Sequence, residues 1–183
     1  MKKVIVSIGA LVLFFSSLQA GNFRINKKAS EIRVESKATP PHTVESFVRD
    51  YTADIQLDTN TLAVSKADFS FKLKDFDSAH EKRDKKMYSW IESDRFPEIA
   101  FKLTNIIEVN GQTIGKGSLT MHGVSKEIEV PFSIIQKGNT ILLDGSAGFS
   151  YEDWNLEIIR LFLFRVRPDL KVTFHLEGTA VGE

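Results

Sequence analysis

Alternating hydrophobic and polar positions recur along most of this chain. In residues 115–132 the pattern runs up to Gly123 and resumes after it, and its apolar side is formed by Leu119, Met121, Ile128, Val130 and Phe132. Glycine permits a tight chain reversal at low steric cost. One apolar side and one polar side are typical of a half-buried antiparallel hairpin. We therefore expect two strands joined by a tight turn, with one face toward an apolar interior.

The same alternation predicts strands before and after this hairpin. They cover residues 23–37, residues 43–58 with Phe47, Tyr51 and Ile55 on one side, residues 64–73, a segment beginning at Ile99, residues 140–151 and a last segment from Leu170 to Leu176. Asn110-Gly111 favours a two-residue hairpin turn. About eight strands with short turns favour an up-and-down barrel or a sandwich. An eight-stranded barrel either fills with its own side chains or holds one small ligand.

The period changes to that of a helix after Ser78. Ser78-Ala79-His80-Glu81 has the form of a capping box, in which the serine accepts from the fourth residue's amide and the glutamate reaches back. Met87 and Ile91 follow at helical spacing and form a narrow apolar stripe. We therefore expect an all-β fold with one amphipathic helix over about residues 79–92.

The first 20 residues have the pattern of a secretory signal peptide. Lys2 and Lys3 precede an apolar run from Val4 to Phe15, and small or polar residues follow up to Ala20. The run is too short and wrongly flanked for a membrane span. We therefore predict cleavage after Ala20 and one mature domain of residues 21–183, with an uncleaved N-terminal anchor as the alternative.

Charge and cysteine content narrow the function classes. Without Lys2 and Lys3 the chain has 22 basic and 24 acidic residues, which gives no electrostatic reason to bind nucleic acid. An export signal without any cysteine points to a bacterial periplasm. The four histidines share no metal-ligand spacing, so no metal site is predicted.

An enzyme built on this chain would have to use His122 or His175. Both are in phase with threonines on polar strand faces, and neither has a recognisable catalytic partner in the sequence. The chain has no nucleophile elbow and no phosphate-binding glycine loop. We therefore expect structural histidines, and we predict no catalytic residue and no cofactor.

Phenylalanine is unusually abundant, with 14 residues in the whole chain. Ordinary core packing explains part of this content, but inward phenylalanines on different strands can also surround an apolar chain. With the helix stripe and the central hairpin, they predict a cavity wall of Phe69, Phe71, Met87, Ile91, Phe101, Leu119, Met121, Val130, Phe132, Phe149 and Phe174. A lipid would gain about 0.8 kcal/mol for each CH₂ buried there, before ordering costs.

Two groups of cations accompany this predicted interior. One lies in the charged run 81–86, and the other flanks an unusually apolar segment within residues 155–167. A solvated helix face explains the first group. The alternative is a cavity mouth that meets an anionic headgroup, for which the candidates are Arg83, Lys86 and Arg160.

Three segments occur in a characteristic order and spacing: Gly117–Lys126, the Glu81–Phe101 segment with its Phe96-Pro97 pair, and the Asp153-Trp154 turn. Together they resemble the YceI-like family of lipocalin-like, polyisoprenoid-binding periplasmic proteins, over nearly the whole mature chain. The resemblance implies an extended eight-stranded antiparallel barrel with a helix over one end. It also implies a long apolar cavity that holds an isoprenoid chain, such as a quinone or a polyprenyl phosphate.

The leading hypothesis is therefore a non-enzymatic periplasmic carrier or sequestering protein for an isoprenoid-type lipid. A second hypothesis is a structural or protein-interaction module, in which side chains fill the barrel and the apolar run 158–164 is a contact surface. The third is an enzyme that uses His122 or His175. The sequence is compatible with a transient membrane-surface contact and with a dimer, but it does not define the oligomeric state.

Overall fold

Strands make up most of the protein. The computed structural model describes residues 20–161 and 164–182, so the predicted signal peptide lies outside the described residues except for Ala20. The described strands are β1 (Ala20–Ile25), β2 (Glu31–Thr39), β3 (His42–Val48), β4 (Thr52–Asp58), β5 (Val64–Lys72), β6 (Phe76–Asp77), β7 (Glu98–Val109), β8 (Gln112–Met121), β9 (Val124–Lys137), β10 (Thr140–Ser150), β11 (Arg160–Leu161) and β12 (Phe164–Gly182). The described helices are η1 (Leu73–Asp75), α1 (Glu81–Trp90) and η2 (Tyr151–Trp154).

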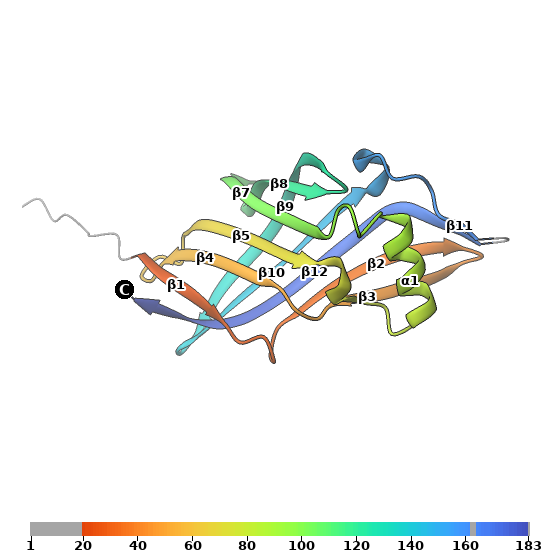
Figure 1. The fold of residues 1–183 in the computed structure, drawn as a ribbon. Helices are drawn as coiled ribbons and strands as arrows, with labels where there is room; N and C mark the ends of the chain where they lie inside the picture. The colour runs from red at the N-terminus through yellow and green to blue at the C-terminus, as the bar shows by residue number, and fades with distance from the viewer. Residues whose placement is uncertain (1–19, 162–163, 183) are drawn as a thin grey trace, which may run out of the picture.

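The strand pairing closes into a ring (Figure 1). The order β1-β4-β5-β7-β8-β9-β10-β12 returns to β1, because β1 pairs with both β4 and β12. All of these pairings are antiparallel, so the predicted eight-stranded antiparallel barrel is confirmed and the sandwich alternative is wrong. The predicted turn at Asn110-Gly111 joins β7 to β8, and a turn at Gly138-Asn139 joins β9 to β10.

Two predicted strands are each broken in two. The predicted strand 23–37 is β1 followed by β2, and both halves pair with the 19-residue β12. The predicted strand 43–58 is β3 followed by β4. Val48 is buried, whereas Phe47 is only half-buried and lies under the Arg49 guanidinium. The expected inward position of Phe47 is therefore wrong, because a one-residue change of phase between two strands moves every side chain to the other face.

The helix is present where it was predicted, but its cap is different. His80 is the N-cap residue, and its Nδ1 accepts a hydrogen bond from the Arg83 amide at 3.4 Å. Ala79 has a φ of +58°, which leaves Ser78 outside the helix. The Ser78 hydroxyl instead donates to Asp84. The predicted capping box is therefore wrong, because its serine forms a different hydrogen bond.

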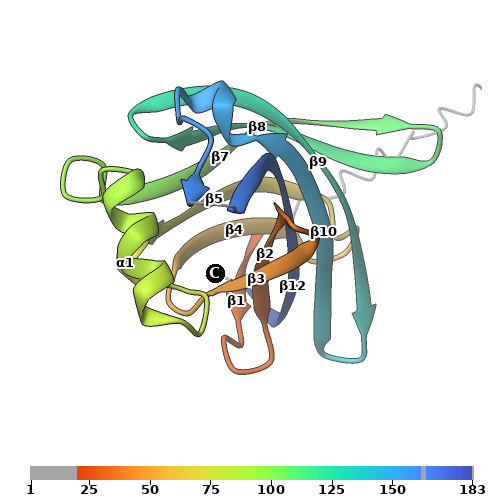
Figure 2. The ribbon, with the colours of Figure 1, turned by 90° about the vertical axis from the view of Figure 1, so that its right-hand side faces the viewer.

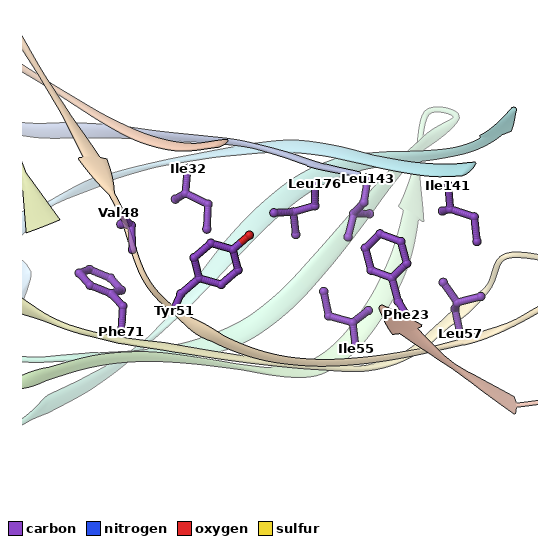
Figure 3. Close-up of a cluster of buried hydrophobic side chains, with 10 residues drawn as sticks. All are labelled: Phe23, Ile32, Val48, Tyr51, Ile55, Leu57, Phe71, Ile141, Leu143 and Leu176. Carbon is purple, nitrogen blue, oxygen red and sulfur yellow. The ribbon is translucent and has the colours of Figure 1, made fainter. Parts of the chain in front are cut away.

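Apolar side chains fill one end of the barrel. Figure 3 shows an apolar cluster that begins at this end and extends into the barrel, with side chains from opposing walls pointing toward one another. Phe23, Leu57 and Ile141 are 5%, 0% and 1% exposed, respectively. We call these three residues the plug.

The opposite end is less completely paired. β3 pairs with β6 through only two positions, Phe47–Asp77 and Val48–Phe76. This ladder therefore covers only the last two residues of β3. Figure 2 shows α1 beside β3 at this end of the barrel. We call the β3 edge from His42 to Ser46, together with α1, the mouth.

Candidate functional site

A cavity of about 820 Å³ occupies the barrel between the mouth and the plug. This volume is toward the upper end of the range of about 300–1,000 Å³ that is common for small-molecule sites. Its floor includes Ile55, Leu143 and Leu176, and none of the three plug residues lines it. The wall is apolar because one side chain in two points inward along each strand, and those positions are mostly aliphatic or aromatic.

The structure brings all eleven predicted wall residues to this cavity. They are Phe69, Phe71, Met87, Ile91, Phe101, Leu119, Met121, Val130, Phe132, Phe149 and Phe174. Their contact with a ligand stays a prediction. Val44 and Val48 also line the cavity. They are absent from the predicted wall because the expected phase of β3 was wrong.

Two of the three predicted headgroup residues lie at the mouth. Arg83 and Lys86 line the cavity from α1, and Lys82, which is not among the predicted residues, lines it as well. No ion pair involves Lys82, Arg83 or Lys86 within residues 20–161 and 164–182. Arg160 is exposed on β11, opposite Arg165, and is not a lining residue.

Hydrogen bonds hold α1 against the barrel. The Tyr88 hydroxyl donates to the Phe76 carbonyl at 3.0 Å, and Trp90 Nε1 donates to the Glu157 carbonyl at 2.8 Å. The Arg83 guanidinium donates to the hydroxyl and to the carbonyl of Ser78. Burial raises the pKa of Tyr88 above its ordinary value, which favours the neutral phenol as donor. Polar contacts therefore hold Arg83 in place, and α1 also packs against the barrel through Met87, Tyr88 and Trp90.

The segment before α1 is held by the Asp77 carboxylate. It accepts from the Ala79 amide at 2.7 Å and from Arg49 Nε at 2.9 Å. These two donors lower the pKa of Asp77 below its ordinary value, the backbone amide having the larger effect. The carboxylate therefore links β6 to the start of the helix.

The two histidines considered for catalysis lie outside the cavity lining. His122 Nδ1 donates to the Trp154 carbonyl at 3.1 Å, and its ring packs edge-on against Phe96 with centroids 4.7 Å apart. His175 Nδ1 lies 2.6 Å from Asp144 Oδ1, in a contact between side chains that are both more than 40% exposed. The geometry gives His122 a structural role at the turn between β8 and β9.

The three segments behind the family resemblance meet around His122. Trp154 is 1% exposed, and its Nε1 donates to the Leu119 carbonyl at 3.1 Å. Gly123 has a φ of +71°, and a Cβ there would lie 2.6 Å from Phe96. We call Phe96, His122, Gly123 and Trp154 the signature corner. These contacts explain why the three segments, which are distant in the sequence, occur together as a family pattern: each residue of the signature corner contacts another of the four.

The described residues contain no group of three or more histidines or acidic residues that could hold a metal ion. No described helix is long and apolar enough to cross a membrane.

The hypothesis of an interaction module required a barrel filled by its own side chains, and the cavity does not fit that requirement. Of its proposed contact run 158–164, Ile159 lines the cavity, whereas Phe162 and Leu163 lie outside the described residues.

These features define a class of protein: an antiparallel β-barrel with one filled end and an apolar cavity open toward a helix. The chain belongs to the YceI-like family, whose YceI-like domain model matches residues 23–178. A UPF0312 protein of Vibrio parahaemolyticus is 28% identical over 158 residues, which are 81% of this chain and 82% of that protein. A UPF0312 protein of Photorhabdus laumondii is 24% identical over 157 residues, 81% of each chain.

Solved structures share the fold. BcnA of Burkholderia cenocepacia superposes with a TM-score of 0.75 at 20% identity, over 85% of this chain and 100% of BcnA. A domain of Saccharophagus degradans, described as polyisoprenoid-binding and implicated in plant cell wall breakdown, gives a TM-score of 0.66 at 12% identity. That match covers 90% of this chain and 100% of the domain.

Proposed function

We propose that this protein is a non-enzymatic periplasmic carrier or sequestering protein, which holds an isoprenoid-type lipid such as a quinone or a polyprenyl chain in its cavity. The observation that carries the proposal is the cavity itself, about 820 Å³ in volume and lined mainly by aliphatic and aromatic side chains. Burying the five carbons of one isoprene unit would contribute roughly 4 kcal/mol before ordering costs. A few units are therefore enough for firm binding.

Because one end of the barrel is filled and the other is open, the lipid can bind in only one orientation. The plug blocks one end, so the chain enters from the mouth with its tail toward Ile55, Leu143 and Leu176. The polar end of the lipid then lies near Arg83 and Lys86. The same cations can attract the mouth to an anionic membrane surface during loading, which supports a transient membrane contact.

Two further observations support the proposal. The polyisoprenoid-binding domain of Saccharophagus degradans has the same fold. The N-terminal pattern of a secretory signal peptide supports export to the periplasm.

The test uses the full chain, expressed with its own N-terminal segment and recovered by osmotic shock. Native mass spectrometry of the released protein should show an adduct, and solvent extraction should identify it as an isoprenoid lipid. Deletion of residues 2–20 should retain the protein in the cytoplasm. A released protein without any adduct, which also takes up no isoprenoid quinone or polyprenyl lipid from micelles, would contradict the proposal.

A further inference from the structure

Two hydroxyl groups interrupt the apolar wall just inside the mouth. Ser36 on β2 and Ser46 on β3 both line the cavity, and Ser46 is 4% exposed. Their nearest inward neighbours on these strands are aliphatic, namely Val34, Ala38, Val44 and Val48, and the next lining residue toward the hairpin tip is His42. A hydroxyl in such surroundings is unfavourable unless it finds a hydrogen-bond partner. The two positions therefore call for a partner that the strands do not supply.

Neither hydroxyl finds that partner in the protein. Within residues 20–161 and 164–182, no hydrogen bond joins the side chain of Ser36 or Ser46 to another residue. Ser78, the third serine of the wall, differs: its hydroxyl donates to Asp84 Oδ1 and accepts from Arg83 Nε at 2.8 Å. Ser36 and Ser46 thus keep their hydrogen-bonding capacity for the contents of the cavity.

The strand register places the two serines close together. Ser46 lies opposite Val34, and Ser36 lies opposite Val44, so the serines are diagonal neighbours on one face of the β2–β3 hairpin. Diagonal neighbours are about 7–8 Å apart, which allows both hydroxyls to reach one headgroup. The hairpin tip pairs Ala38 with His42, two residues beyond Ser36. The hydroxyl pair therefore lines the cavity at the mouth, to which Ser46 itself belongs.

We propose that Ser36 and Ser46 bind the neutral oxygen of the lipid headgroup, as found in a quinone, a phenol or an alcohol, so that this headgroup lies inside the barrel. The inference rests on the proposed function and narrows its ligand. A hydroxyl donates to a neutral carbonyl or hydroxyl oxygen with little desolvation cost. A phosphate at the same place would lose its hydration among aliphatic residues, and the nearby Arg83 already donates to Ser78.

The experiment compares three isoprenoids of similar chain length: a quinone, a hydrocarbon without oxygen, and a polyprenyl phosphate. The wild type, the Ser36→Ala/Ser46→Ala double variant and the outward control Ser133→Ala are titrated with each. We expect the double variant to bind the quinone about tenfold more weakly, from the loss of two hydrogen bonds. Hydrocarbon affinity should stay within about twofold, and Ser133→Ala should match the wild type, because Ser133 is exposed on β9.

A second measurement reads the hydrogen bonds directly. The infrared carbonyl stretch of the bound quinone should lie at lower frequency in the wild type than in the double variant. A Ser36→Thr/Ser46→Thr variant, which keeps both hydroxyls, should restore the shift and the affinity, which also controls for folding.

The outcomes separate this inference from the proposed function. Equal quinone affinity and an equal carbonyl frequency in the wild type and the double variant would overturn the hydroxyl site, while isoprenoid binding itself would stand. A phosphate that binds more tightly than the quinone, and loses that advantage in the double variant, would overturn the neutral headgroup. A wild type that binds none of the three isoprenoids would refute both proposals.

Discussion

The two ends of the barrel are built by the same alternation of inward and outward residues, but one end is closely packed and the other encloses a cavity. At the plug, Leu57 and Ile141 are almost completely inaccessible, and apolar side chains meet across the barrel. At the mouth, α1 contains no buried residue; its half-buried Met87, Tyr88 and Trp90 pack against the barrel, and Tyr88 and Trp90 also donate hydrogen bonds to it. The plug end stabilises the barrel by close apolar packing, whereas the mouth end leaves a cavity with polar groups at its entrance.

The difference shows how one small domain can be stable and still carry a cavity. Close packing at one end supplies dispersion and hydrophobic burial, since protein interiors gain most where voids are absent. The lining residues toward the mouth lack such contacts on their inner side. A ligand that fills the cavity would supply those contacts, so we expect binding to stabilise the mouth more than the plug.

The largest effect should come from opening the plug. Leu57→Ala leaves a void in a fully buried position and should lower the free energy of unfolding by about 3 kcal/mol. Met87→Ala, on the half-buried face of α1, should cost less than about 1.5 kcal/mol. Urea unfolding of both variants without ligand measures the difference. Equal losses would show that the two ends do not differ in packing.

A smaller effect should follow from filling the cavity. Val130→Trp places an indole where Val130 lines the lumen and should weaken isoprenoid binding at least tenfold, or about 1.4 kcal/mol. Glu129→Trp, one residue away on the exposed outer face, is the matched control and should bind normally. Titration with a fluorescent isoprenoid analogue provides the readout. Unchanged affinity in Val130→Trp would place the lipid elsewhere.

Loosening the helix should have a moderate effect confined to the mouth. Trp90→Phe keeps an aromatic ring but removes the hydrogen bond to the Glu157 carbonyl, at a cost of about 1 kcal/mol. Amide hydrogen exchange should accelerate in α1 and not in β10, and the lipid should dissociate a few times faster. Faster exchange in β10 as well would mean that Trp90 supports the whole barrel.

Acid should affect the mouth through Asp77. The Ala79 amide and Arg49 lower the pKa of this carboxyl in the folded state. Its stabilising contribution is therefore complete above the unfolded pKa of about 4 and is lost as the pH falls through the lower folded value. Asp77→Asn should reduce the steepness with which the unfolding free energy declines below about pH 4. An identical decline in the wild type and the variant would assign the acid sensitivity to other groups.

The sequence predicts the barrel well because inward and outward positions follow strict alternation. The hairpin with Leu119, Met121 and Phe132 has the expected strands, and these side chains line the cavity. The alternation does not predict the break between β3 and β4, because Phe47 and Tyr51 are in phase along one unbroken strand. The sequence does contain a sign of this break: the apolar inward positions are even-numbered in β3 and odd-numbered in β4.

Other parts of the site depend on tertiary contacts that no local pattern encodes. Ser36 and Ser46 are ordinary polar residues in the sequence and become notable only because they face an apolar cavity. The family motifs predicted the fold, but their residues His122 and Trp154 brace the signature corner rather than line the cavity. The most recognisable residues are thus structural, while most of the predicted cavity wall consists of commonplace apolar residues.

The most direct test is a methyl NMR titration of the protein with an isoprenoid quinone. Cavity methyls of Met87, Leu119 and Met121 should shift and saturate at one equivalent, whereas the methyls of the plug residues Leu57 and Ile141 should shift little. Saturable binding that shifts the plug or the outer surface and leaves the cavity methyls unchanged would contradict the central claim, as would the absence of any saturable shift.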